Sequence, residues 1–309
     1  MKITFFIFIT ADGKWSRSKM RFSRLGILSV ILLTVLMGAN CSYYNRIITR
    51  KNLVDGGQAY KDRKFPDAEQ LFRSAVSRDP QGQTVEGKAA QLFLARTLHS
   101  QFIGNRQITE KADAAIQEYK KVLKDDVKDQ NSFNAVANLL ENLNKNDEWL
   151  QWVTERANNE SVPNEQRAEA MTKLTAKRYS CANEISDVDP VKKTVKKDGK
   201  DVFQFSKPED SATFETFKKC VQDGLELANR AEKLNTESDA VWSYKANMLI
   251  QQSRLAEMEG NKEQIETLKL EADKAKARFK QLADARKAKE DADKAAKEAE
   301  QNATNANKK

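Results

Sequence analysis

The stretch DAEQLFRSAVSRDP, residues 67–80, constrains the fold more than any other part of the chain. Ala68, Phe72 and Ala75 are four and three residues apart, so a helix places them on one face. Small alanines beside a large ring allow a neighbouring helix to approach closely. Prolines stand at the first turn of this helix and just after its end, where they begin and stop a helix. The stretch therefore predicts the second helix of a helical hairpin.

This spacing, A-x3-F-x2-A-x4-P beginning twelve residues after Gly56, resembles the second-helix half of the tetratricopeptide (TPR) repeat. Similar patterns recur along the chain, and the resemblance extends from roughly Arg46 to Phe279. One hairpin cannot bury its own apolar face, so the resemblance implies a stack of hairpins, that is, a solenoid that binds other proteins. The other copies lie at residues 89–98, 115–122, 224–231, 242–249 and 268–275; the match is good at the first and last repeats and weak between them.

Composition agrees with a helical fold, because the 309 residues include only 11 Gly and 5 Pro. One insertion departs from it. Residues 191–205 alternate apolar and polar side chains on either side of Asp198-Gly199, which predicts a β-hairpin with a type I′ turn. Its five lysines fit either a solvated hairpin with charged edges or a binding arm. The predicted fold class is all-α: a TPR-like helical-hairpin solenoid with a small β-hairpin insertion and a charged helical C-terminal tail.

The expected organisation has three parts. Residues 1–40 form a leader, with Met20 as an alternative start. Residues 41–279 form the repeat domain, with the insertion at 187–210. Residues 280–309 form a tail rich in Ala, Lys and Glu, helical at first and disordered at its end. The alanine spacing of the tail could pair helices, but alanines bury little surface, so a solvated helix is favoured over a contact with cell wall or protein.

The leader is predicted to be an export signal. Arg21 and Arg24 precede an apolar run at residues 25–37, which is short for a membrane span. The following Gly-Ala-Asn-Cys41 resembles the lipobox of bacterial lipoproteins, in which the cysteine is lipidated and becomes the new N-terminus. Asn40 departs from that pattern, because a small residue normally precedes the cysteine. The alternative is an uncleaved anchor. Either reading places the bulk of the chain outside the cytoplasm, in the bacterial cell envelope.

Other function classes find little support. The net charge of +8 arises mostly in residues 1–40, which hold six basic residues and one acid, so nucleic-acid binding is not indicated. His99 is the one histidine, which argues against a histidine metal site or a catalytic triad. No phosphate-binding loop, nucleophile elbow or zinc-protease motif occurs. We expect no enzyme activity, no cofactor, no metal and no small-molecule substrate.

Cys181 and Cys220 remain as a pair once Cys41 is set aside. In an oxidising compartment they could form a disulfide that encloses the hairpin insertion. The alternative is two buried thiols on helical faces.

The resemblance to TPR proteins also implies a partner-binding groove lined by the first helices of the hairpins. On that analogy Arg96, His99, Asn247 and Gln251 face a protein or peptide partner. The expected function is a membrane-tethered scaffold or adaptor. Three alternatives stay open: a lipoprotein of outer-membrane barrel assembly, a structural envelope protein, and an enzyme without a recognisable motif.

Overall fold

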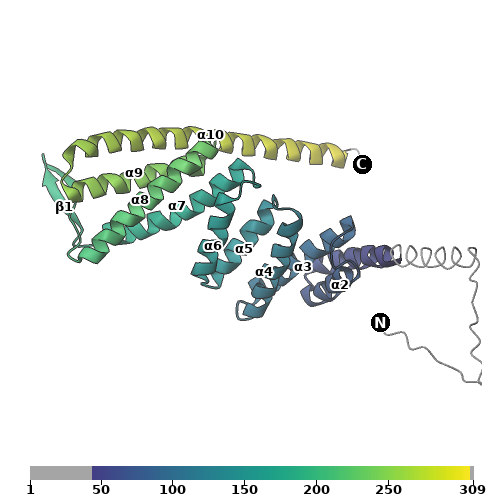
Figure 1. The fold of residues 1–309 in the computed structure, drawn as a ribbon. Helices are drawn as coiled ribbons and strands as arrows, with labels where there is room; N and C mark the ends of the chain where they lie inside the picture. Colours follow the sequence, from purple (N-terminus) through teal and green to yellow (C-terminus); the bar gives the residue numbers. More distant parts are fainter. Residues whose placement is uncertain (1–43, 307–309) are drawn as a thin grey trace, which may run out of the picture. The chain divides into compact units, whose positions relative to one another are not determined.

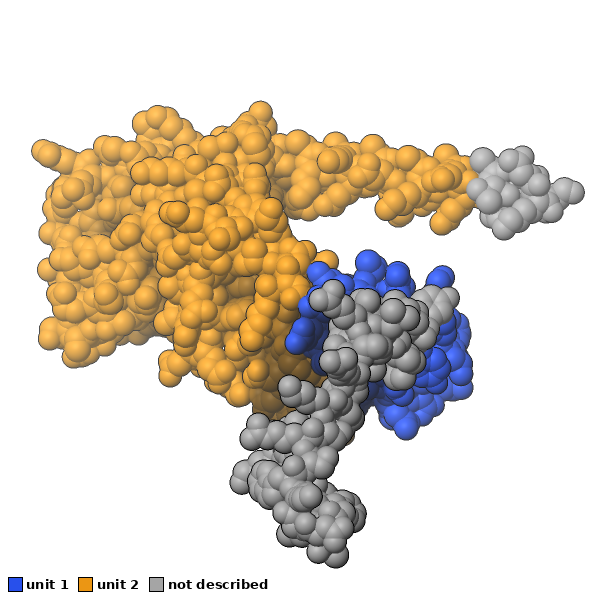
Figure 2. Space-filling view, turned by 45° about the vertical axis from the view of Figure 1, so that its right-hand side comes forward, with its two compact units in different colours: residues 1–97 blue, residues 98–309 orange. Residues whose placement is uncertain are grey.

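The computed structural model describes residues 44–306, and the side chains of residues 44–301. Cys41 and the leader lie outside the described residues. The described chain forms two compact units, which divide between Thr97 and Leu98, within one helix (Figure 2). Each unit is described by itself.

Unit 1 contains a helix over residues 44–61, then α2 (Phe65–Arg78) and the first part of α3 (Val85–Gly104). Ala68, Phe72 and Ala75 are fully buried, as their spacing predicts. The Phe72 ring stacks on Phe93 with centroids 5.5 Å apart. A Cβ on Gly56 would lie 2.8 Å from the Phe72 ring, so only glycine fits where the first helix crosses this ring. Close packing between the two helices of a hairpin explains the motif.

Unit 2 continues with the rest of α3 and consists mainly of helical hairpins (Figure 1). Its short helices are about 13 to 17 residues long, and the later ones are longer. The bounds are α4 Thr109–Asp125, α5 Gln130–Asn142, α6 Asn146–Asn158, α7 Asn164–Ser186, α8 Ser211–Leu234, α9 Asp239–Glu259 and α10 Lys262–Ala306.

Local sequence sets these boundaries. Asp129 and Asp210 accept hydrogen bonds from the first backbone N–H groups of α5 and α8, and Ser238 does the same for α9. Gly260 ends α9 in the left-handed conformation, with φ of 77°, which glycine adopts without strain. Helix α3 continues past His99 to Gly104, and a short loop then leads to α4.

The two strands β1 (Lys192–Lys197) and β2 (Lys200–Phe205) pair antiparallel between α7 and α8. Asp198 and Gly199 have φ of 51° and 75°, as a type I′ turn requires. The structure thus confirms the predicted fold class, an all-α TPR-like stack of helical hairpins with a small β-hairpin insertion.

The C-terminal helix α10 packs on α9 through Leu268, Ala272 and Ala275, and then continues without a break. From residue 284 to residue 301 every described side chain is exposed. Arg286 forms an ion pair of 3.0 Å with Asp239 at the start of α9. Figure 2 shows the remaining length projecting from unit 2 as a rod.

Candidate partner-binding groove

Two predicted groove residues lie on α3, in different units. The Arg96 guanidinium lies over the Phe93 ring, 5.5 Å from its centroid, in unit 1. His99 lies in unit 2, half-buried against α4, with its Nδ1 atom 3.4 Å from the Tyr119 hydroxyl. Burial, and then the nearby charge of Arg106, lower the pKa of His99, so the ring is neutral at pH 7. Both side chains pack against their own repeats.

The other two predicted residues lie on α9, and Gln251 is a wrong prediction. Its side chain is 0% exposed, so it cannot contact a partner. Instead its Oε1 accepts a hydrogen bond of 2.9 Å from the Ser186 hydroxyl, and its Nε2 donates to Asn183 Oδ1 at 3.2 Å. The long helix α7 continues far enough to cover this position, which a standard repeat would leave open. Asn247 is partly exposed.

The first helices of successive hairpins in unit 2 do line a hollow, which we call the A-helix groove. It has a volume of about 360 Å³ between α5, α7 and α9, and Trp149 of α6 contributes to its floor. Asn247 lies one helical turn beyond Tyr244, a lining residue, and so on the same side of α9. The lining residues are Ala137, Asn138, Glu141, Trp149, Lys173, Ala176, Lys177, Tyr179, Ser180 and Tyr244.

A ladder of polar side chains joins α5 to α7, and only its second part, beyond Glu169, lies among the residues that line the groove. Glu169 accepts hydrogen bonds from Gln130 Nε2 at 2.8 Å and from Asn134 Nδ2 at 3.1 Å. About two helical turns further on, Lys177 pairs with Glu141 at 2.7 Å. The Oδ1 atom of Asn134 is buried and has no hydrogen-bond partner, although buried polar atoms rarely stay unpaired. The ladder therefore leaves an acceptor unused.

Aromatic rings complete the groove. Tyr179 and Tyr244 meet edge to face with centroids 6.5 Å apart, which joins α7 to α9. Trp149 is only 6% exposed, and the ammonium group of Lys177 lies 5.1 Å from its ring centroid. Rings, amides and balanced charges on a solvent-accessible hollow can hold an extended chain by its backbone and one or two side chains.

None of the ten residues that line the groove was among the four predicted from the sequence. Gln130, Asn134 and Asn138 recur every four residues on α5, beside the apolar stripe that packs the hairpin. Such a polar stripe on a first helix is a usable signal. The pairing of this stripe with α7 cannot be predicted from the sequence, because it depends on how far the two hairpins are rotated relative to each other.

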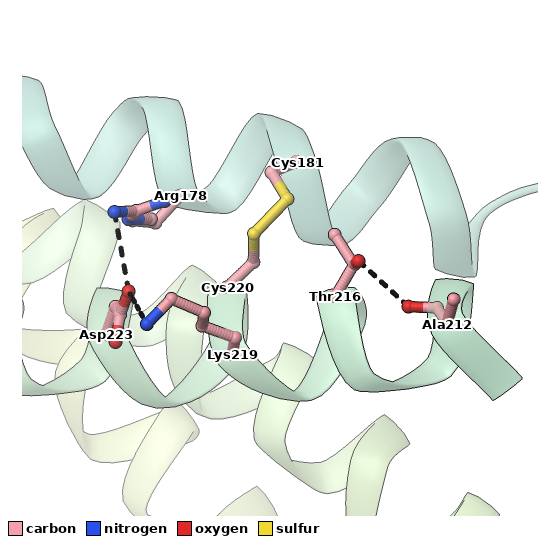
Figure 3. Close-up of a disulfide and its surroundings, with 7 residues drawn as sticks. All are labelled: Arg178, Cys181, Ala212, Thr216, Lys219, Cys220 and Asp223. Atoms are coloured by element: carbon pink, nitrogen blue, oxygen red, sulfur yellow. Dashed lines mark hydrogen bonds and ion pairs between the residues drawn. A yellow bond between two sulfur atoms is a disulfide. The ribbon is translucent and has the colours of Figure 1, made fainter.

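The cysteines lie away from the groove, on α7 and α8. Cys181 and Cys220 form a disulfide with their Cα atoms 6.2 Å apart (Figure 3). One turn along both helices, Asp223 pairs with Arg178 at 3.4 Å and with Lys219 at 3.6 Å. The cross-link thus fixes α7 to α8 next to the base of the β-hairpin.

Residues 44–306 contain neither a candidate membrane span nor a candidate metal-binding cluster. No helix there has a stretch long and apolar enough to cross a membrane. In the same part of the chain, no group of three or more His, Cys, Asp or Glu side chains lies close enough together to hold a metal ion.

Comparison with known proteins gives only distant structural likeness. No protein-family model matches the sequence, and no curated protein matches it. The solved structure of YrrB, described as a TPR protein with an unusual peptide-binding site, is 10% identical, with a TM-score of 0.37 over 76% of this chain and 90% of that one. PilF of Pseudomonas aeruginosa is 12% identical, with a TM-score of 0.35 over 78% and 99%. A tetratricopeptide repeat protein from Parabacteroides merdae is 12% identical, with a TM-score of 0.33 over 76% and 97%. Likeness this distant carries no argument about function.

Proposed function

We propose that this chain is a scaffold of the bacterial cell envelope that binds an extended segment of a partner protein in the A-helix groove. The observation that carries the proposal is the groove itself, a hollow between three first helices that is lined by amide, hydroxyl and aromatic side chains. The Asn138 amide and the Ser180 hydroxyl can accept hydrogen bonds from the backbone N–H groups of a bound peptide. Extended peptides present such donors at regular spacing.

The groove chemistry favours recognition of a backbone over recognition of a strongly charged side chain. Lys173 and Lys177 face Glu141 and Glu169, so charges of both signs already compensate one another. Asn138 and Ser180 add exposed polar groups that both donate and accept hydrogen bonds. The Tyr244 ring offers an apolar surface to one side chain of the bound segment.

The envelope location is part of the proposal. The disulfide between α7 and α8 supports it, because structural disulfides are typical of oxidising compartments. The signal-like leader and Cys41 support attachment of the chain to a membrane by lipid. Stable attachment of this kind needs more than one acyl chain. Lipidation of Cys41 at the outer face of a membrane is thus the proposed anchor, and the uncleaved leader is its alternative.

The groove is tested by site-specific photo-crosslinking in native membranes. A photoreactive amino acid is placed at Asn138 or at Tyr244 of the full-length chain, and crosslinked peptides are identified by mass spectrometry. We expect one partner, crosslinked through one short segment from both positions. The same reagent at Gln151, an exposed position on α6, is the matched control and should not yield this product.

A triple variant gives the quantitative test. Changing Asn138, Tyr244 and Asn247 to alanine should reduce recovery of the partner about tenfold, because each lost contact contributes about 0.5 kcal/mol or more. The melting temperature should change by less than about 3 °C, since the three side chains are not in the core. Undiminished recovery would rule out the A-helix groove as the binding site.

The same preparation tests the anchor and the alternatives. An N-terminal peptide that begins at an acylated Cys41 supports the lipoprotein reading, and a retained leader contradicts it. Capture of a large β-barrel protein would instead favour a role in barrel assembly, and recovery of cell-wall material without a protein partner would favour a structural role.

A further inference from the structure

The β-hairpin extends beyond the ends of the helices that carry it, as Figure 1 shows for β1. Its apolar side chains are not all covered, since Phe203 is 59% exposed and Val202 is 37% exposed. Lys193, Lys196 and Lys197 are exposed, and none of them has an acidic partner among the described residues. The Phe203 ring is contacted by Lys192 of the same hairpin, whose ammonium group lies 4.2 Å from the ring centroid. The unpaired lysines are therefore the feature that points to a partner.

The base of the hairpin is firmly attached. Val191 is 6% exposed and belongs to the same apolar cluster as Cys220 of the disulfide. The Phe205 ring packs at the edge of this cluster, with the Arg254 guanidinium 4.6 Å from its centroid. Isolated two-stranded hairpins are only marginally stable, so this attachment holds the strands in place. The hairpin is therefore an ordered arm.

The register determines which backbone groups are open. Lys197 and Lys200 flank the two-residue turn, so they form a hydrogen-bonded pair, and every second pair along the strands does the same. The bond of 2.8 Å from Ser206 N to Val191 O at the base follows this alternation. The intervening residues direct their backbone N–H and C=O groups away from the partner strand.

On β1 those outward residues are Lys192, Thr194 and Lys196. Lys192 N–H is already used, since it donates to Val188 O at 2.9 Å. Thr194 and Lys196 keep open N–H and C=O groups, with no hydrogen bond to them among the described residues. The outer edge of β2 is in part covered, because α9 lies against it and supplies a carboxylate to its last backbone N–H. Both edges are therefore open near the turn. The β2 edge carries Asp201, whereas the β1 edge carries four lysines and no acidic residue.

Lysines stand on both faces of this edge. Lys193 and Lys197 share one face, and Lys192 and Lys196 share the other, since side chains alternate along a strand. A strand added to β1 would place its side chains beside these lysines on both faces, where opposite charges stabilise and like charges repel. A second copy of β1 is thus disfavoured.

We propose that β1 is a docking edge for an extended, acidic segment of a partner protein, which adds to the hairpin as a third strand. The backbone groups of Thr194 and Lys196 supply the hydrogen bonds, and the lysines on both faces select Asp and Glu. This site is independent of the A-helix groove, so either can fail without the other.

The probe is a fluorescent ten-residue peptide with Glu-Glu-Thr-Val-Glu-Glu at its centre, titrated against the full-length chain. We expect saturable binding that weakens as salt is raised. Hydrogen exchange at the Thr194 and Lys196 amides should slow at least about threefold at about 80% saturation or above, because these amides become hydrogen-bonded. A peptide of the same sequence, N-methylated at alternate residues so that it cannot pair with an edge, should bind at least about tenfold more weakly.

Two variants separate charge from backbone pairing. Lys193→Glu with Lys197→Glu should weaken binding at least about tenfold, and Lys287→Glu with Lys289→Glu, the same charge change on the exposed part of α10, should have little effect. Thr194→Pro removes one outward N–H without removing a bond between β1 and β2, and should also weaken binding. Equal binding of the methylated peptide, or equal loss in the α10 control, would overturn the proposal. So would binding of anionic phosphatidylglycerol vesicles through these lysines without any binding of the peptide.

Discussion

The hairpin α5–α6 and the hairpin α7–α8 are built on the same repeat but differ almost twofold in length. The helices of the short pair have 13 residues each, and those of the long pair have 23 and 24. Ten further residues extend a helix by about 15 Å. A standard repeat therefore accounts for the whole length of the short pair but for only about half the length of the long pair.

The two pairs also differ in what stabilises them. In the short pair the packed stripes leave a gap that Arg156 fills, with its guanidinium 4.8 Å from the Phe133 ring centroid. In the long pair the extension has its own apolar cluster, the disulfide, and a polar network around Gln251. Added length thus requires added constraints, and these surround the base of the β-hairpin. Removing each constraint in turn tests this difference.

Removal of the disulfide should have the largest effect. Cys181→Ala with Cys220→Ala opens a loop with a sequence separation of 39 residues. The chain-entropy model predicts a loss of about 4 kcal/mol in the free energy of unfolding. Because contacts in a solenoid are mostly between neighbours, the loss should be concentrated in the long pair. Hydrogen exchange should accelerate in β1, β2 and the adjoining ends of α7 and α8, and much less in α5 and α6.

A substitution on the same helix serves as the control for the disulfide. Thr216 lies one turn from Cys220, and its hydroxyl donates only to Ala212 O, at 2.9 Å (Figure 3). Thr216→Ala should change the free energy of unfolding by about 0.5 kcal/mol or less. Equal acceleration of exchange in both pairs after disulfide removal would show that the extension is not a separate cooperative part.

In the short pair the corresponding test is Arg156→Met. Arg156 is 5% exposed and donates to Val127 O and to the side chains of Gln130 and Gln166. Methionine keeps the apolar stem but leaves these acceptors unpaired, so the free energy of unfolding should fall by about 3 kcal/mol. Urea unfolding followed by Trp fluorescence measures this fall. Arg230→Met, which removes one hydrogen bond to Asn158 at 2.8 Å, is the control and should lose about 1 kcal/mol or less. A loss for Arg156→Met no larger than the control would mean that packing alone holds the short pair.

Much of the fold could be predicted from the sequence, because its signals are local. The stripe of Ala68, Phe72 and Ala75 is buried as predicted, and Asp198-Gly199 forms the predicted turn. Arg156 could not be predicted as buried. Its partners are a loop carbonyl and two amides from other helices, and nothing in its own helix shows that they converge on it.

The groove residues were harder to predict than the fold. Analogy with a standard repeat gave Arg96, His99, Asn247 and Gln251, but α7 is longer than a standard helix and covers Gln251. A groove depends on how neighbouring repeats are rotated and on where each helix ends. Both are set by packing between distant residues, which a repeat motif does not encode.

The smallest of the predicted effects concerns Gln251, and its neighbour provides the comparison. Gln251 is fully buried and hydrogen-bonded to Ser186 and Asn183, whereas the Oε1 atom of Gln252 is buried without a partner. Gln251→Leu keeps the volume but leaves the Ser186 hydroxyl without its acceptor and Asn183 Oδ1 with Arg254 as its remaining donor, so the free energy of unfolding should fall by about 1.5 kcal/mol. Gln252→Leu replaces an unsatisfied group and should leave stability unchanged or raise it slightly. Denaturant unfolding of the two variants side by side measures the difference. If Gln251→Leu is as stable as Gln252→Leu, the polar network does not stabilise the long pair, and the disulfide and the apolar cluster suffice to hold the extension.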